Sequence, residues 1–161
     1  MENLGYLDLF GTTGEALTDA DWIDRANRYR TPNLVALNAF YEAGSSKERW
    51  LRMTYRPGSA AMNFAQLSGG SIAEMLDQTA THCGSLVTRW PCPTISMNIT
   101  ILRGARTASY SATGHILKLS RSNALLAADL DDETGTRIAT ATIVSYLLTD
   151  PDRLSEGRRQ D

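Results

Sequence analysis

The hydrophobic periodicity of this chain changes once, and that change limits the folds that the chain can adopt. Between Ile72 and Val87 the apolar and small residues recur at steps of three and four, which predicts one long helix with a single buried stripe. The sequence "RWPCP" ends this helix, because Pro91 and Pro93 lack the amide proton that a continuing helix donates. The following "TISMNITIL" alternates polar and apolar residues, which predicts a half-buried strand.

The runs on either side of this helix and strand are rich in β-forming residues. Three further strands are predicted over residues 108–119, 123–130 and 137–148. The last two are separated by "DDETG", where Gly135 is available for a positive φ. Upstream of the helix, residues 33–41 and 49–56 predict a hairpin around "AGSSKE". A single helix cannot supply several parallel crossovers, so the order predicts an α+β architecture with an antiparallel sheet wrapped around the helix.

The length of 161 residues suits one domain with one core. We expect residues 1–32 to form an N-terminal extension with a short helix capped by Thr18 or Asp19. Residues 33–149 are predicted to form the main domain, and residues 150–161 a polar C-terminal tail.

Composition and charge exclude several classes of protein. The net charge of −2 comes from 16 basic and 18 acidic residues spread along the chain, which gives no broad basic surface for nucleic acid. No stretch approaches the roughly 20 apolar residues of a membrane span, and the first residues lack the features of a signal peptide. We therefore expect a soluble, cytoplasmic protein. Cys83 and Cys92 are predicted to be reduced and buried, and no Cys or His cluster has the spacing of a metal site.

The segment "LSGGSIAEMLDQTA" combines a helix start with an isolated carboxylate. Ser71 and Glu74 have the spacing of a capping box. Gly69 and Gly70 leave the approach to the helix N-terminus without side chains, so a ligand atom can reach backbone N–H groups with partial positive charge. Asp77 lies off the apolar stripe, and no Lys or Arg stands three or four residues away. Two interpretations of Asp77 stay open at this point, a solvated helix residue or a functional acid.

Three segments together resemble a known family. "SGGSIAEMLDQTA", "PTISMNITILRGAR" and "SRSNALLAADLDDETGTRIATATIVSYLL" are similar to the hot-dog acyl-CoA thioesterases of the phenylacetate-degradation and 4-hydroxybenzoyl-CoA thioesterase type. That family typically has His-Gly-Gly, an acid nine positions after the His, and then a patterned strand. The resemblance covers about residues 33–148. It implies the hot-dog fold and hydrolysis of the thioester of a small or medium acyl-CoA.

The resemblance also implies a role for each residue that matches the family motif. Asp77 matches the catalytic carboxylate, which acts as a nucleophile or as the base that activates water. Gly69 matches the residue whose backbone N–H polarises the thioester carbonyl, and Thr94 matches a position beside the attacking water. Asn63 approximates an Asn upstream of the glycines, although the spacing here is one residue shorter.

Other positions match substrate-binding parts of the family. In family members a tight turn often contacts coenzyme A, and its residues here are Ser120, Arg121, Ser122 and Asn123. A simple polar hairpin turn is the alternative for that segment. Arg103 and Arg106 are candidates to pair with nucleotide phosphates, with ordinary exposed arginines as the alternative. Ser68 and Gly70 are the remaining candidates for substrate binding. This chain has Ser68 where the family usually has His, and a hydroxyl cannot change charge near neutral pH.

Helix geometry and the resemblance both predict a dimer. Asp77 lies on the order of 10 Å along the helix axis from Gly69, so one chain cannot easily aim both at one carbonyl. Two antiparallel helices related by a two-fold axis bring Asp77 of one copy to Gly69 of the other. We expect a homodimer that also forms a homotetramer as a dimer of dimers. The expected partner is an acyl-CoA substrate, with coenzyme A as part of that substrate, and no metal, redox cofactor, nucleic acid or membrane.

Two other functions remain open. A non-catalytic hot-dog protein that binds acyl-CoA or another acyl ligand is favoured by Ser68 in place of the motif His. A hot-dog enoyl-CoA hydratase is suggested by the spacing of Asp77 and His82. Side chains five positions apart on one helix point about 140° away from each other, which disfavours the hydratase.

Overall fold

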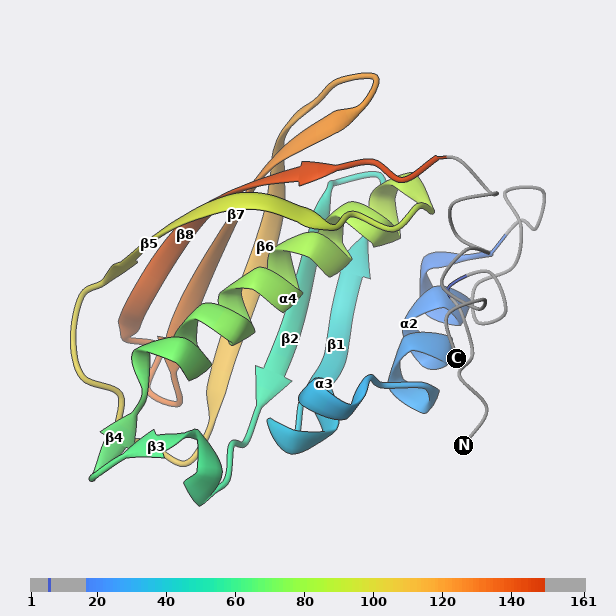
Figure 1. The fold of residues 1–161 in the computed structure, drawn as a ribbon. Helices are drawn as coiled ribbons and strands as arrows, with labels where there is room; N and C mark the ends of the chain where they lie inside the picture. The colour runs from blue at the N-terminus through green and yellow to red at the C-terminus, as the bar shows by residue number, and fades with distance from the viewer. Residues whose placement is uncertain (1–5, 7–16, 150–161) are drawn as a thin grey trace, which may run out of the picture.

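A six-stranded antiparallel sheet wraps around one long helix in the computed structural model, which describes Tyr6 and residues 17–149 (Figure 1). The predicted C-terminal tail over residues 150–161 and most of the N-terminal stretch before residue 17 lie outside the described residues. In spatial order the strands are β1 (Phe40–Ser45), β2 (Trp50–Tyr55), β6 (Tyr110–Leu119), β7 (Asn123–Asp132), β8 (Arg137–Tyr146) and β5 (Thr94–Ile101). This arrangement confirms the predicted α+β architecture. None of the described helices is long and apolar enough to cross a membrane.

The central helix α4 (Gly69–Thr88) buries one stripe against the concave face of the sheet. Its buried apolar side chains are Ile72, Met75, Leu76, Ala80, Cys83 and Leu86. The helix sits close to β6 because Gly114 has no side chain, and a Cβ there would lie 2.7 Å from the carbonyl oxygen of Thr79. The buried hydroxyl of Tyr55 contacts Thr79 Oγ1 at 2.8 Å, so these two polar atoms under the helix are paired. The predicted helical stripe is therefore confirmed.

The start of α4 differs from the sequence prediction. Ser68 is the N-cap, and its hydroxyl accepts a hydrogen bond from the backbone N–H of Ser71 at 3.1 Å. The capping box proposed for Ser71 and Glu74 is wrong, because the Ser71 hydroxyl donates instead to the carbonyl oxygen of Ala61 at 3.0 Å. Both glycines therefore belong to the first turn of the helix. The helix ends as predicted before Pro91, with Arg89 in the left-handed region at φ 61.

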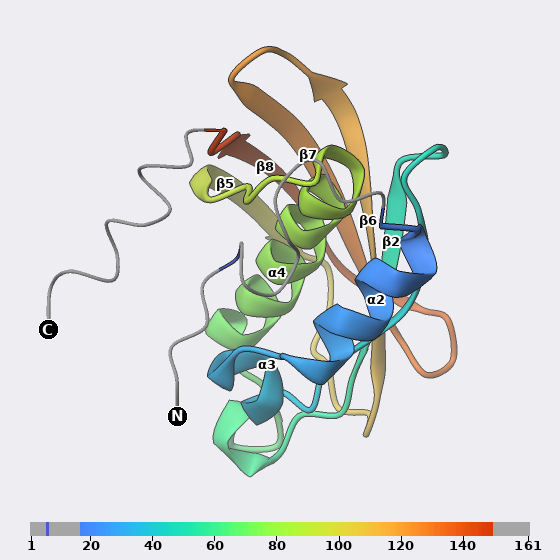
Figure 2. The same ribbon diagram turned by 90° about the vertical axis from the view of Figure 1, so that its right-hand side faces the viewer.

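The N-terminal part of the described chain packs beside the open edge of the sheet at β1 (Figure 2). Helix α2 (Asp19–Arg28) is capped by Thr18, and the Asn27 side chain exchanges two hydrogen bonds with the backbone of Tyr41 on β1. Helix α3 (Pro32–Ala36) corrects the predicted strand over residues 33–41, because Pro in the first turn favours a helix start and the strand begins only at Phe40. Arg89 joins the end of α4 to Asp19 of α2 by an ion pair at 2.8 Å.

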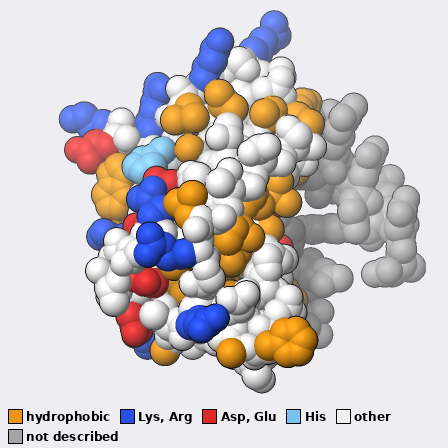
Figure 3. All heavy atoms as spheres, turned by 90° about the vertical axis from the view of Figure 1, so that its left-hand side faces the viewer, with side chains coloured by type: hydrophobic (Ala, Val, Ile, Leu, Met, Phe, Trp, Pro, Cys, Tyr) orange, Lys and Arg blue, Asp and Glu red, His pale blue; other side chains and the backbone are white. Residues whose placement is uncertain are grey.

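Strand β5 alternates polar and apolar residues as predicted, but it is not half-buried. It pairs with β8 at the edge of the sheet, and Ile95, Met97 and Ile101 are 59%, 48% and 47% exposed. Figure 3 looks onto this side of the molecule, where hydrophobic side chains are visible over much of the face. The period-two pattern correctly indicated a strand with an apolar face, and nothing in the single described chain covers that face.

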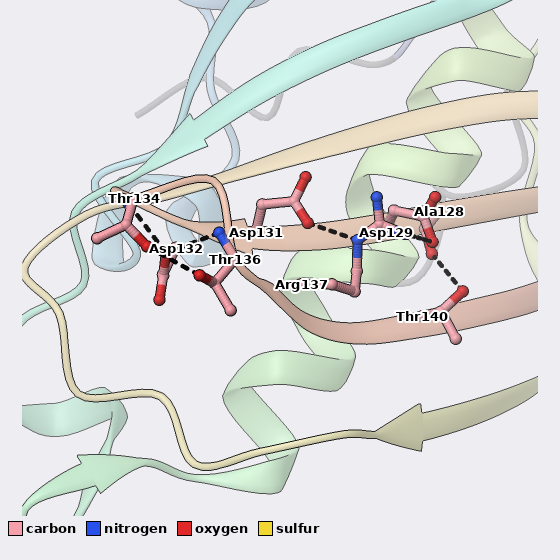
Figure 4. A network of polar contacts seen from close by, with 8 residues as sticks. All are labelled: Ala128, Asp129, Asp131, Asp132, Thr134, Thr136, Arg137 and Thr140. Atoms are coloured by element: carbon pink, nitrogen blue, oxygen red, sulfur yellow. Dashed lines mark hydrogen bonds and ion pairs between the residues drawn. The ribbon is translucent and has the colours of Figure 1, made fainter.

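The turn between β7 and β8 carries a dense polar network (Figure 4). Gly135 adopts the predicted positive φ, at 81°. The Asp132 carboxylate accepts hydrogen bonds from the backbone N–H groups of Thr134 and Thr136 at 2.9 and 3.0 Å. Next to it, Arg137 contacts Asp129 at 2.8 Å and Asp131 at 2.5 Å.

The short hairpin of β3 (Met62–Asn63) and β4 (Gln66–Leu67), preceded by the 3-10 helix η1 (Ser59–Ala61), lies before the start of α4.

Candidate active site

The structure brings Asp77 and Thr94 into direct contact. Asp77 lies in the middle of α4 and Thr94 is the first residue of β5. The Thr94 hydroxyl donates a hydrogen bond to Asp77 Oδ1 at 2.5 Å, although the two residues are 17 positions apart. The chain returns along the helix because α4 ends before Pro91 and β5 then pairs with β8. One carboxylate oxygen is thus held by Thr94, and the other remains available to a ligand or water.

The environment of Asp77 destabilises its ionised form. Burial raises the pKa of this half-buried carboxyl, the hydrogen bond from Thr94 lowers it, and the nearby charge of Glu74 raises it, with a net upward shift. Among the described residues, no Lys or Arg forms an ion pair with Asp77. A carboxylate with little solvation and one hydrogen-bond donor suits proton abstraction or nucleophilic attack. This environment therefore favours the interpretation of Asp77 as a functional acid over that of a solvated helix residue.

The first turn of α4 presents exposed backbone donors. Gly69 and Gly70 are exposed, and the described part of the chain offers no acceptor to their N–H groups. A Cβ added at Gly69 would meet only Ile101 Cδ1, at 3.5 Å, and one at Gly70 would meet only Ser68 Oγ, at 3.9 Å. Packing within the chain therefore does not require glycine at either position. The glycines keep open space in front of two unpaired amides.

The other predicted residues near this turn gather around it. Asn63 on β3 pairs with Gln66 on β4, and both line a shallow surface hollow together with Phe64 and Arg106. The backbone N–H of Leu67 donates to the carbonyl oxygen of Ala105 at 2.9 Å, which ties the segment around Arg106 to the start of α4. Arg103 lies just after β5 and is exposed. Its positive charge lowers the pKa of Asp132, and this effect is smaller than those of the hydrogen bonds from Thr134 and Thr136.

The predicted coenzyme A turn lies at the opposite end of the helix. Ser120 donates to the carbonyl oxygen of Asn123 through its N–H at 2.9 Å and through its hydroxyl at 2.8 Å, so these residues form a tight exposed turn with Arg121 and Ser122. The N–H of Leu147 donates to the carbonyl oxygen of Ser122, and the neighbouring N–H of Leu148 donates to that of Pro91. The turn therefore stands close to the loop that leads into Thr94.

The candidate residues thus form two groups. Asp77 and Thr94 meet at the middle of α4, and the turn over residues 120–123 lies near the C-terminal end of the helix. Ser68, both glycines, Asn63 and Arg106 lie around its N-terminus. Eight helical residues separate Gly69 from Asp77, which is about 12 Å along the axis. A single chain does not bring the two groups to one reacting atom.

Sequence reasoning missed a cavity of about 380 Å³ next to Asp77. Its wall on α4 consists of Gln78, Thr81, His82 and Ser85, which stand one, four, five and eight positions after Asp77. Pro93, the neighbour of Thr94, also lines it. Helical periodicity could have shown that these four residues share one flank, but the opposite wall comes from the docked N-terminal segment and has no sequence signal.

His82 is the one ionisable side chain of α4 in this wall. Its Nδ1 lies 2.8 Å from the carbonyl oxygen of Gln78, and its ring packs edge-on against Tyr41 with centroids 5.4 Å apart. Burial lowers the pKa of His82 to about 4, against smaller upward effects of the Gln78 carbonyl and Glu74. The imidazole is therefore neutral at pH 7 and does not contact Asp77, which argues against a paired Asp–His hydratase site.

Comparison with known proteins supports the fold. No sequence-family profile and no curated protein sequence matches the chain. Among solved structures, the E. coli PaaI protein from the phenylacetic acid degradation operon is similar with a TM-score of 0.72, at 13% identity over 81% of this chain and 94% of that chain. Zebra fish thioesterase superfamily member 2 is similar with a TM-score of 0.69, at 22% identity over 82% of this chain and 99% of that chain. A thioesterase from Haemophilus influenzae is similar with a TM-score of 0.70, at 18% identity over 85% of this chain and 96% of that chain. These neighbours confirm the predicted hot-dog fold.

Proposed function

We propose that this hot-dog protein is a thioesterase that hydrolyses the thioester of a small or medium acyl-CoA. The observation that carries the proposal is the Asp77 carboxylate, which is half-buried, has no cationic partner among the described residues, and is held by Thr94. A carboxylate placed in this way costs stability and is expected where it serves a reaction. The similar solved structures include thioesterases, which supports the same class of reaction.

The proposed mechanism needs two copies of the chain. The Gly69 N–H at the start of α4 donates to the thioester carbonyl oxygen and stabilises the negative charge that develops there. Asp77 of the other copy removes a proton from a water molecule held by Thr94, and the water oxygen attacks the carbonyl carbon. The tetrahedral intermediate then expels the coenzyme A thiolate, which takes the proton back from Asp77. Direct attack by Asp77, followed by hydrolysis of the resulting anhydride, is the alternative route.

The division of the candidate residues into two groups supports a homodimer. Two helices packed antiparallel would place the Asp77 group of one copy against the Gly69 group of the other, so that two equal sites form around one two-fold axis. The exposed Ile95, Met97 and Ile101 on β5 offer an apolar surface for such contact. In this assembly the turn over residues 120–123, Arg103 and Arg106 are the proposed coenzyme A contacts. A homotetramer would be a dimer of such dimers.

The test is thiol release from a panel of acyl-CoA esters. We expect Asp77→Asn to lower kcat/KM by about 1,000-fold or more, roughly 4 kcal/mol, because the amide can neither accept a proton nor attack. Asp132→Asn at the β7–β8 turn is the matched control and should keep its activity. Size-exclusion chromatography must show the same dimer for both variants. Turnover of Asp77→Asn within tenfold of the unaltered protein would refute the assignment.

One observation favours a second function. The Ser68 hydroxyl is engaged in capping α4 and contacts Ser71 Oγ at 2.9 Å, so this position supplies no group that titrates near neutral pH. A protein with this site but without turnover would bind acyl-CoA as a ligand. Binding measured by calorimetry, together with no thiol release from any ester in the panel, would establish that alternative.

A further inference from the structure

We propose that the cavity beside Asp77 holds the acyl group and selects an uncharged acyl chain of up to about ten carbons whose far end carries a hydroxyl that donates to His82 Nε2. This inference rests on the proposed thioesterase function, since it names the substrate class of the same site. It goes further because it assigns a specificity-determining residue and a role for the N-terminal segment.

The cavity lies where the acyl part of a thioester bound at Asp77 would extend. On α4 the lining begins at Gln78, the residue after Asp77, and includes Thr81, whose hydroxyl donates to the backbone carbonyl oxygen of Asp77 at 2.7 Å. Pro93, also in the lining, precedes Thr94, the residue bound to the Asp77 carboxylate. From there the lining continues along α4 toward its C-terminus, past His82 to Ser85.

The walls limit the size and charge of the occupant. The volume of about 380 Å³ corresponds to about a dozen non-hydrogen atoms, at roughly 30 Å³ each. Most of the lining is aromatic or aliphatic, including Tyr29, Tyr41 and Leu148, and no Lys, Arg, Asp or Glu is among the described residues that line it. A carboxylate at the end of the acyl chain would have no cation to pair with there. The cavity therefore suits an apolar chain of moderate length.

His82 places one hydrogen-bond acceptor in this apolar space. A carbonyl oxygen only accepts, so the contact between Nδ1 and the Gln78 carbonyl fixes the proton on Nδ1. In the neutral ring Nε2 then carries a lone pair, and no group among the described residues donates to it. Five helical residues separate His82 from Asp77, about 7.5 Å along the axis. A hydroxyl several carbons from the thioester is at the right depth to donate to Nε2.

The N-terminal segment closes this space. Ala26 of α2, the C-cap residue Tyr29 and Thr31 line the cavity opposite α4. The helix is held there by the paired hydrogen bonds between Asn27 and Tyr41 and by the ion pair between Asp19 and Arg89. The extension before the hot-dog domain thus has a definite role, because it forms one wall of the acyl pocket.

The test compares matched substrates in the full-length protein. We measure kcat/KM for 6-hydroxyhexanoyl-CoA and 8-hydroxyoctanoyl-CoA against the unsubstituted hexanoyl and octanoyl esters. One of the two hydroxylated esters should be preferred by about fivefold to tenfold, as expected for one buried hydrogen bond. In His82→Phe, which keeps a ring and removes both nitrogens, the ratio should fall to 1 or below. The same substitution at His115, exposed on β6, is the control and should leave the ratio unchanged.

A binding experiment separates this inference from the proposed reaction. The same four esters are titrated by calorimetry into Asp77→Asn, with and without His82→Phe. A hydroxyl preference in binding that depends on His82 supports the pocket, and if the unaltered protein releases no thiol from any of the four esters, the thioesterase is refuted while the pocket stands. Thiol release with equal ratios in the unaltered protein and His82→Phe supports the thioesterase and refutes the pocket. Turnover of palmitoyl-CoA as fast as octanoyl-CoA would also overturn the size limit.

Discussion

The middle of α4 and the β7–β8 end of the sheet both carry ionisable side chains, but the fold treats them in opposite ways. On α4, burial raises the pKa of Asp77 and lowers that of His82, so both groups are pushed toward their neutral forms. At the β7–β8 end, hydrogen bonds lower the pKa of Asp132, and Arg137 stands between two carboxylates (Figure 4). The second region stabilises its charges, and the first does not.

The difference distinguishes a structural cluster from a candidate site. Asp129, Asp131 and Asp132 at the β7–β8 end each have a partner that explains their presence, either the Arg137 guanidinium or a backbone N–H group. Among the residues that the structure describes, Asp77 has only the Thr94 hydroxyl, and His82 has only one carbonyl oxygen and an aromatic edge. Local structure accounts for the first set completely. The second set retains an unused carboxylate oxygen and an unused imidazole nitrogen, which are the groups that a substrate would engage.

The largest expected effect on stability is a loss on acidification that depends on His82. The unfolded chain takes up a proton near pH 6.5, whereas the folded protein does so only near pH 4. The free energy of unfolding should therefore fall by about 2 kcal/mol between pH 7.5 and pH 5 through this group alone. Urea denaturation at each pH measures it. His82→Phe should lose that slope, and His115→Phe should keep it. A slope equal in all three proteins would contradict the burial of a neutral imidazole.

Much of the fold follows from residue patterns, and the failures have physical causes. The change of period at "RWPCP" predicted the helix and the strand after it, and runs of β-forming residues predicted the three further strands. Two serines three residues apart both suit an N-cap, and Ser68 takes that role because Ser71 is engaged by Ala61, a contact invisible in the sequence. Alternation in β5 indicated an apolar face but not what covers it. The first strand was placed too early because Pro32 starts a short helix.

The candidate site, like the fold, could be predicted from the sequence only in part. Asp77 stood out in the sequence because no cationic neighbour explains it, and its position relative to Thr94 followed from a family resemblance. The cavity could not be predicted, because α2 is positioned by contacts such as that between Arg89 and Asp19, which are 70 residues apart. Pairings at that separation depend on the completed fold.

A second prediction tests whether Thr94 acts on Asp77 or only packs beside it. Thr94→Val keeps the shape and removes the donor, so kcat should fall by about tenfold, roughly 1.4 kcal/mol. Because this hydrogen bond lowers the pKa of Asp77, its loss should raise that pKa further and move the acid limb of the pH–rate profile to higher pH. Thr140→Val on β8, which removes a 3.5 Å contact to Ala128, is the control. A lower kcat with an unmoved acid limb would assign Thr94 a packing role.

A third prediction concerns the charged cluster of the sheet. Arg137→Met removes both ion pairs, and we expect the free energy of unfolding to fall by about 1 kcal/mol or less, because the Arg137 side chain is 43% exposed and solvent screens both pairs. The loss should shrink further in 1 M salt. Thioester hydrolysis should be unaffected. A large loss of activity would place Arg137 in the site and remove the distinction between the two regions.

The smallest predicted effect is opposite in sign for the two regions. Asp77→Asn removes a desolvated carboxylate that has no cation among the described residues, so the free energy of unfolding at pH 7 should rise by about 0.5 kcal/mol. Asp131→Asn removes a partner of Arg137 and should lower it by a similar amount. Both are measured by urea denaturation at one protein concentration, because dissociation of a dimer would otherwise enter the result. If Asp77→Asn destabilises the protein as Asp131→Asn does, Asp77 has a stabilising partner in the folded protein. Its raised pKa would then no longer separate it from the structural carboxylates.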